Sequence, residues 1–323
     1  GELNAQAGIA NALVSRLGVE GARADRVENT SASGASAIHR GVEAIAGGAD
    51  VALVVGVEKM SGGETAAVTE SISRLVHERE YAQGLTLPSF AGIAADAYLD
   101  RYDVPREALA TVAVKNHENA VHNQFAQFRT SVTVEEALES PVIAAPLRLF
   151  DCCSMTDGAA AVVLSREGDV SVEGVAGATG THAVAARPDP LKITSVRTAG
   201  ERAFARTACD RDDVDVACIH DAFTILELLE LEELGFYDAG TAWRATQAGE
   251  TALDGQLAVN PGGGLKARGH PLGATGVSQI VELVWQLRGD APTARQVPGE
   301  PETGLAINVA GFGNNSVCTV LSG

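Results

Sequence analysis

Lysine is scarce in this chain of 323 residues. It occurs only at Lys59, Lys115, Lys192 and Lys266, and arginine supplies the rest of the 24 basic residues. Asp and Glu together number 42, which gives a formal net charge of −18. A surface with this excess of acid repels a phosphate backbone, so the composition excludes nucleic acid as a partner. Acidic surfaces stay hydrated in strong salt, which also screens their self-repulsion, and we interpret the charge as a solvation adaptation.

Long hydrophobic runs are also missing. No uncharged apolar run of about 18 residues occurs, so we expect no membrane span. No basic-then-apolar leader precedes the first helical pattern, so we expect no signal peptide and a cytoplasmic protein. The five cysteines form neither a CxxC pair nor a Cys/His ligand spacing, which favours reduced, mostly buried thiols over a zinc or redox site.

Helical and strand-like patterns alternate along the chain. Continuous apolar runs such as DVALVVGVE (50–58) and DGAAAVVLS (157–165) are typical of buried strands. Between them, a polar stretch with Pro and Gly punctuation predicts an inserted subdomain. We therefore expect a first half at 1–165, a loop subdomain inserted at 62–150, and a second half at 166–323.

The two halves repeat one plan. GAAAVVLS (158–165) resembles NSVCTVLS (315–322), and ADVALVVGVE (49–58) resembles VDVACIHDAF (214–223). Like segments in like order predict an internal duplication, with two α/β halves that contain mixed sheets and pack on each other. The predicted elements are helices at 8–17, 35–46, 107–120, 195–207 and 271–287, and strands at 26–29, 50–58, 157–165, 172–178, 304–309 and 316–321.

The segment NPGGGLKARGHPLGATG (260–276) carries the most chemical information. Its glycines let backbone N–H groups approach a ligand closely, and a His followed by Pro at the start of a helix is held in place. His270 is therefore a candidate general base, and a capping or core histidine is an equally good interpretation.

Two further segments place polar residues at predicted strand ends. In HDAFT (220–224), His220 lies where α/β sheets usually bind ligands, and Asp221 lies near the first turn of the following helix. A strand-end residue satisfied by the backbone is the alternative for His220. In GVEKMS (56–61), a loop-fixing hydrogen bond is a better interpretation of Glu58 than catalysis.

Ser31 heads a run of very small residues in VENTSASGASA (27–37). A helix of such residues can pass close to neighbouring backbone, and its N-terminus offers N–H groups beside Ser31. A nucleophile and an oxyanion can both be served there. Serine is also a preferred N-cap, and this segment alone favours a capping role.

Taken together, these segments resemble the thiolase superfamily, in its sterol-carrier-protein-type and archaeal branch. The resemblance rests on VENTSASG, VGVEKMS, LRLFDCCSMTDGAAAVVLS, HDAF and NPGGGLKARGHPLGATG, which span the whole chain. It implies an α/β thiolase fold: two duplicated βαβαβαββ halves, stacked in five layers α/β/α/β/α, with an inserted loop subdomain. It also implies acyl transfer between coenzyme A thioesters.

Two positions depart from the usual thiolase pattern. Ser31 stands where the family normally has the nucleophilic cysteine, and Val309-Ala310-Gly311 replaces the CxG segment near the end. The chain resembles more closely the β-ketothiolases of halophilic archaea, which use a serine with two histidines and pair the catalytic subunit with a small OB-fold subunit. The resemblance therefore implies a small OB-fold subunit as a candidate partner for this chain. By this resemblance His270 activates Ser31, His220 takes the substrate proton alone or with His270, and the N–H groups of Ser31 and Gly311 bind one oxyanion.

The resemblance also implies where coenzyme A binds. Its phosphates would lie on the inserted subdomain, where we single out Lys115, Arg129 and Arg148. Phe223 and Gly263 are further candidates for contact with the substrate. Coenzyme A thioesters are substrates, and no cofactor is expected.

Two functions follow as hypotheses. The first is an active β-ketothiolase that makes or cleaves 3-ketoacyl-CoA through an acyl-serine, in polyhydroxyalkanoate, isoprenoid or fatty-acid metabolism. The second is a catalytically silent subunit that binds CoA thioesters or acts as a scaffold in an acyl-CoA enzyme complex. Retention of both histidines favours the first, whereas loss of both cysteines favours the second. In either case we expect a homodimer or a dimer of dimers.

Overall fold

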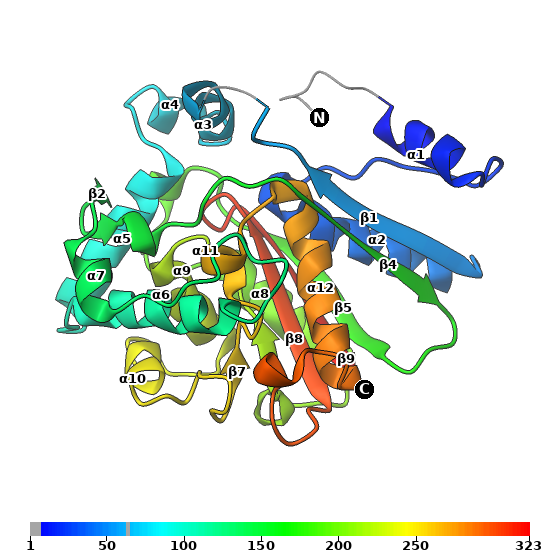
Figure 1. The fold of residues 1–323 in the computed structure, drawn as a ribbon. Helices are drawn as coiled ribbons and strands as arrows, with labels where there is room; N and C mark the ends of the chain where they lie inside the picture. Colours follow the sequence, from blue (N-terminus) through cyan, green and yellow to red (C-terminus); the bar gives the residue numbers. More distant parts are fainter. Residues whose placement is uncertain (1–7, 63–64) are drawn as a thin grey trace.

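The computed structural model describes residues 8–62 and 65–323 (Figure 1). The first part contains α1 (Ile9–Leu17), the short 3₁₀ helix η2 (Thr30–Ala32), α2 (Ser33–Ala46) and β1 (Val51–Glu58). The expected helices and the strand at 50–58 are therefore present. The expected strand at 26–29 is wrong, because those residues form an irregular segment that leads into η2.

The polar insertion is mainly helical. It comprises α3 (Thr65–Ser73), α4 (Glu78–Tyr81), α5 (Leu87–Arg101), α6 (Glu107–Ala120), α7 (Val134–Glu139), the hairpin β2 (Val142–Ala144) and β3 (Leu147–Arg148), and η3 (Leu149–Asp151). The chain then returns through β4 (Gly158–Ser165). Buried residues of α5, including Phe90 and Tyr98, join the same hydrophobic core as α9 (Thr224–Leu234) of the second half. The insertion leaves the first half and covers the second.

The second half contains more strands. In order they and their helices are β5 (Ser171–Thr179), η4 (Val184–Ala186), α8 (Thr194–Phe204), η5 (Arg211–Asp213), β6 (Val216–Cys218), α9 (Thr224–Leu234), α10 (Ala242–Gln247), β7 (Ala258–Val259), α11 (Gly264–Arg268), α12 (Leu272–Arg288), η6 (Thr293–Arg295), β8 (Thr303–Ala310) and β9 (Asn315–Ser322). They form a mixed five-stranded sheet in the order β5-β9-β8-β6-β7, in which β6 runs parallel to β7 and β8.

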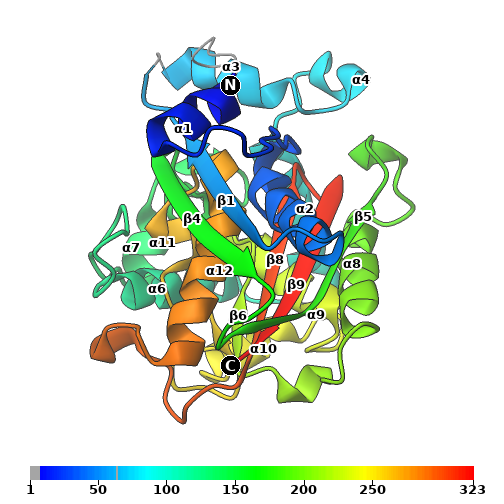
Figure 2. The ribbon, with the colours of Figure 1, turned by 90° about the vertical axis from the view of Figure 1, so that its right-hand side faces the viewer.

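Two sheets enclose a central helical layer (Figure 2). β1 and β4 pair antiparallel in the first sheet, and α2 and α12 pack between that sheet and the five-stranded one. On the far side, α8 covers β5 and β9. The described residues account for four of the five expected layers, because the outer face of β1–β4 is exposed at Val51, Leu53, Val57 and Val163.

The duplication is visible in strand pairing, with one correction. β1 pairs antiparallel with β4 over its full length, and β8 pairs with β9 in the same way. The counterpart of β1 is thus β8, whereas the sequence comparison assigned that place to residues 214–223. Those residues form the short strand β6 and the irregular turn after it. The likeness was misleading because buried strands share an apolar composition.

Candidate active site

Ser31 lies in a strained turn at the head of α2. Thr30, just before it, has φ +47°, a left-handed conformation that is costly for a β-branched residue. The turn is closed by Ser33, whose hydroxyl accepts the Asn29 N–H at 2.8 Å and donates to the Thr30 carbonyl at 2.6 Å. Neither η2 nor α2 has a side-chain cap hydrogen bond, so the capping role that the segment alone favoured for Ser31 is wrong.

The Ser31 side chain is left without that structural task. Its residue is 4% exposed, and within the described residues its hydroxyl makes no hydrogen bond. Its oxygen is not among the buried polar atoms without a partner, so it keeps contact with solvent and is free of structural hydrogen bonds. The hydroxyl is therefore available for chemistry.

The small residues after Ser31 let α2 meet α12 backbone to backbone. A Cβ added at Gly34 would come within 2.8 Å of the Gly276 and Val277 nitrogens. A Cβ at Gly276 would come within 2.2 Å of the Ala35 nitrogen. The expected close passage of this helix is confirmed, and it brings the Ser31 turn against the first turns of α12.

His270 lies in the loop between α11 and α12. The Thr275 hydroxyl donates to the Pro271 carbonyl at 3.1 Å, so its oxygen accepts a proton from His270 Nδ1 at 2.8 Å. The remaining nitrogen, Nε2, then carries a lone pair. Burial and, secondly, the Arg268 guanidinium lower the pKa of His270 to about 3. His270 is thus a neutral base at physiological pH.

His220 lies in the turn after β6 and has the opposite tautomer. The Asn308 amide nitrogen lies 2.9 Å from His220 Nδ1 and donates to it, so the ring proton is on Nε2. Its backbone N–H donates to Glu230 Oε2 at 2.9 Å. Burial, followed by His270 and Arg268, lowers the pKa of His220 well below its ordinary value. This ring is a neutral hydrogen-bond donor at Nε2.

The tertiary structure brings the two rings together. Their centroids are 4.9 Å apart, and the rings meet edge to face at 87°. The η2 turn packs on α12, the helix that follows His270. It also packs on β8, the strand that carries Asn308, which is hydrogen-bonded to His220. The turn that carries Ser31 thus packs on elements next to both histidines.

Gly311 lies in the tight turn between β8 and β9. Its φ is +60°, and a Cβ there would come within 2.2 Å of Asn314 Oδ1, so only glycine fits. Asn29 Nδ2 donates to Asn315 Oδ1 at 2.7 Å, which ties the Ser31 segment to this turn. Within the described residues, neither the Ser31 nor the Gly311 N–H has an acceptor.

Asp221 also serves a helix N-terminus, but not the expected one. α9 begins only at Thr224, and the Asp221 carboxylate accepts the N–H groups of Leu265 and Lys266 in α11 at 2.6 and 3.1 Å. One carboxylate thus joins the loop of His220 to the helix that leads into His270.

A buried polar network below Asp221 was not foreseen. Asn116 donates to both Asp221 and Glu227 at 2.8 Å, and Asn260 donates to Glu227 at 2.9 Å. Glu227 and Glu230 lie on α9 and are fully buried. The signal in the sequence was acid at every third position of the apolar segment TILELLELEEL, since solvated acids do not belong on a buried face.

Three coenzyme A candidates have structural contacts, and their contact with substrate stays a prediction. Lys115 is 8% exposed and pairs with Glu227 at 2.7 Å, so it is not presented to a phosphate. Arg148 donates to the Ser140 carbonyl at 2.6 Å. A Cβ at Gly263 would come within 2.5 Å of Ala120, so this glycine permits a close approach to α6.

The other two candidates differ in exposure. Phe223 is 8% exposed and its backbone bridges to Cys152, whereas Arg129 is exposed on the loop after α6 and stays a prediction. Glu58 accepts the Gly273 N–H at 3.3 Å, which confirms its loop-fixing role.

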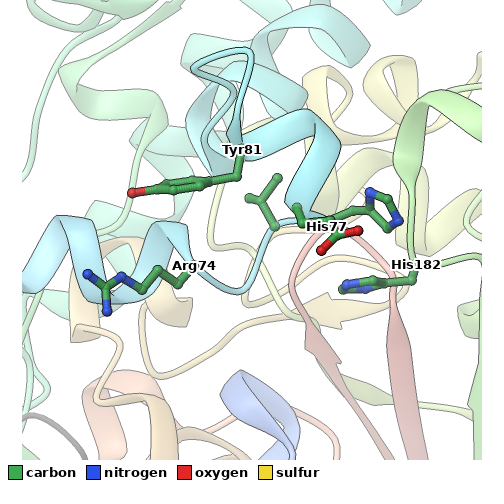
Figure 3. Close-up of a pocket in the computed structure, with 6 residues that line it drawn as sticks. Arg74, His77, Tyr81 and His182 are labelled. Atoms are coloured by element: carbon green, nitrogen blue, oxygen red, sulfur yellow. The ribbon is translucent and has the colours of Figure 1, made fainter.

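None of the three candidate catalytic residues lines the shallow cavity of about 440 Å³ whose lining Figure 3 shows. Arg74, His77, Tyr81 and His182 line it, and the centroids of the His77 and His182 rings lie 5.5 Å apart.

Among the described residues, no group of three His, Cys, Asp or Glu side chains is arranged to hold a metal ion. None of the helices in residues 8–62 and 65–323 combines the length and apolar character needed to cross a membrane.

The fold and the serine–histidine site define a two-half α/β protein of the thiolase class. Residues 2–168 match the family model described as "Thiolase, N-terminal domain", and residues 176–323 match "Thiolase C-terminal domain-like". The chain belongs to the thiolase family.

Named relatives agree with this assignment. The chain is 41% identical to an acetyl-CoA acetyltransferase of Methanothermobacter thermautotrophicus, over 97% of this chain and 84% of the relative. It is 30% identical to sterol carrier protein 2 of Bos taurus, over 96% of this chain and 60% of the relative. Among solved structures, the "Ltp2-ChsH2(DUF35) aldolase" is similar with a TM-score of 0.78 and 25% identity, covering 91% of this chain and 78% of that one.

Proposed function

We propose that the protein is an active β-ketothiolase that works through an acyl-serine on Ser31. The observation that carries the proposal is the pair of opposite tautomers: His270 offers a lone pair at Nε2, and His220 offers a proton at Nε2. One base and one donor beside a buried serine without a capping role suit acyl transfer.

In the first half-reaction, His270 Nε2 takes the Ser31 hydroxyl proton while Oγ attacks the thioester carbonyl carbon. The oxyanion is bound by the N–H groups of Ser31 and Gly311. The carbon–sulfur bond then breaks, and the thiolate of coenzyme A leaves with the proton from His270. Ser31 is left as an oxygen ester.

In the second half-reaction, acetyl-CoA loses a methyl proton to His270 Nε2, and the His220 Nε2–H donates to the enolate oxygen. The enolate carbon attacks the ester, and the Ser31 oxygen leaves and recovers its proton from His270. The expected role of His220 as the base is replaced, because its accepting nitrogen is already occupied by Asn308.

An oxygen ester is a less activated acyl donor than a thioester, so we expect slower deacylation than in a cysteine thiolase. Cys153 and Cys318 offer no ready substitute for Ser31. Burial raises the pKa values of Cys153 and Cys318 to about 12, which leaves both as thiols at physiological pH.

The test is the intact mass of the protein after brief incubation with acetyl-CoA in high salt. We expect an acetyl adduct on the wild type and on Ser36→Ala, which loses only a hydrogen bond from Asn29. We expect none on Ser31→Ala. An adduct that persists on Ser31→Ala contradicts the acyl-serine.

The loss of both family cysteines favours a second function, a silent subunit that binds CoA thioesters within a complex. It predicts CoA binding with no adduct on any variant. A small OB-fold partner subunit is compatible with either function. The aldolase neighbour, whose name joins Ltp2 with ChsH2, is a reason to test whether this chain also binds a partner. Restoration of the adduct by such a partner would return the active function, and light scattering would test the proposed homodimer or dimer of dimers.

A further inference from the structure

We infer that Asn308 is a positioning residue that sets the tautomer of His220 and links this histidine to the helix that begins beside Ser31. The assignment of the His220 tautomer is argued from geometry alone, whereas the effect of Asn308 on catalysis rests on the proposed function.

Asn308 lies in the middle of β8 and is 1% exposed. Its two side-chain ends face two different segments: Oδ1 accepts the Ala35 N–H at 3.4 Å, and Nδ2 lies 2.9 Å from His220 Nδ1. The amide therefore connects α2 of the first half with the His220 turn of the second.

The orientation of this amide is dictated by α2. The Ala35 N–H belongs to the first turn of that helix, where N–H groups have no acceptor within the helix. A backbone N–H can only donate, so it requires the Asn308 oxygen on its side. The amide NH₂ is then turned to His220, and Nδ1 must present a lone pair.

The amide also packs against α12. A Cβ added at Gly276 would come within 2.4 Å of Asn308 Oδ1 and 2.2 Å of the Ala35 nitrogen. The backbone of α12 therefore lies directly against the amide oxygen at this point. One side chain thus touches α2, α12 and the His220 ring.

Other groups around His220 do not set its tautomer. Glu230 on α9 accepts the backbone N–H, and His270 meets the ring edge to face. The Arg268 guanidinium acts through its charge. Within the described residues, Asn308 is the hydrogen-bond partner of the ring.

The decisive variant is Asn308→Asp. A carboxylate cannot donate, so His220 Nδ1 would take the proton and Nε2 would lose it. We expect ¹⁵N shifts of histidine-labelled protein to report the Nε2–H tautomer in the wild type and the Nδ1–H tautomer in Asn308→Asp. Asn123→Asp is the matched control: Asn123 is also buried, donates to the Gly262 carbonyl at 2.8 Å, and does not contact His220. Its His220 shifts should match the wild type.

Loss of one oxyanion donor should slow condensation by about 10²-fold in Asn308→Asp. Acylation of Ser31 should fall less, because it depends on His270. The added carboxylate favours the imidazolium, which again carries a proton at Nε2, so condensation should partly recover as the pH is lowered. A merely structural defect would slow both half-reactions equally and would show no recovery.

If Asn308→Asp does not fold, Asn308→Ala serves instead, and we expect a mixture of the two tautomers. A wild-type His220 with Nδ1–H, or an unchanged tautomer in the folded variants, overturns the inference. A changed tautomer with unchanged condensation leaves the positioning intact and contradicts the proposed role of His220. The shifts are measured without turnover, so failure of the proposed function is distinguished from failure of this inference.

Discussion

β4 and β9 end in the same three letters, VLS, and occupy equivalent places in the two halves, yet their environments differ. β9 is buried over six consecutive residues, whereas β4 alternates between half-buried and exposed positions. Val163 in β4 is 65% exposed, and the equivalent Val320 in β9 is fully buried. β9 lies between β5 and β8 and has helices on both faces. Within residues 8–62 and 65–323, β4 has β1 as its one strand partner and turns one face outward.

The difference shows how the site divides its tasks. The doubly covered sheet carries Asn308 and leads into the turns of His220 and Gly311, and His270 lies in the loop before α12, which packs on that sheet. The exposed sheet contributes no candidate catalytic residue. Its half supplies Ser31 from a separate turn that is carried into the second half by the close contact of α2 with α12.

The largest expected effect compares the two equivalent valines directly. Val320→Ala should lower the free energy of unfolding by about 3 kcal/mol, because it leaves a cavity in a closed core. Val163→Ala should change it by less than about 0.5 kcal/mol, because its side chain is mostly in water. Urea unfolding measures both, and equal losses would refute the contrast between the sheets.

The contact between the halves is the next target. Gly276→Ala forces a methyl group against the Ala35 nitrogen and Asn308, and should cost about 2 kcal/mol of unfolding free energy. It should also reduce acetylation of Ser31. Gly168→Ala is the control, since its added Cβ has only an ordinary contact with Val170 at 3.7 Å. Two variants of equal stability would show that the halves do not meet as tightly as described.

A smaller effect concerns Glu230, which supports the His220 turn. Burial raises the pKa of its carboxyl well above the ordinary 4.5. A raised folded-state pKa contributes stability that is present below the unfolded value and is lost as the pH rises through the folded value. Glu230→Gln should therefore gain stability relative to wild type as the pH rises above the ordinary pKa of a glutamic acid. Parallel unfolding profiles for the two proteins would contradict this.

The smallest expected effect lies on the serine side. Thr30→Gly relieves the left-handed strain and removes a buried hydroxyl that has no partner among the described residues. The relief of strain should raise the unfolding free energy by up to about 1 kcal/mol. The gain is limited because glycine also has more conformational freedom in the unfolded chain. Acetylation of Ser31 should slow, because the turn is less rigid. A less stable variant would show that Thr30 is not strained.

Much of the architecture could be predicted from local pattern. The helix at 107–120 has the predicted bounds, and the strands at 50–58, 157–165, 304–309 and 316–321 lie within a residue or two of theirs. Periodicity and punctuation are local properties, so they are legible in one sequence. The residues 26–29 were misassigned because their conformation is set by contacts of Asn29 with Asn315, far along the chain.

The sequence by itself determined the family, the order of the elements and the groups that we propose for the chemistry: the side chains of Ser31, His220 and His270 and the backbone N–H of Gly311. Only the tertiary structure decided how those groups are prepared. The His220 tautomer depends on Asn308, which lies 88 residues away, and the burial of Lys115 depends on Glu227. A sequence motif identifies a side chain that can form hydrogen bonds. The protonation state of that side chain, and whether it is free to contact a ligand, depend on partners from segments that are distant in sequence and close only in the folded protein.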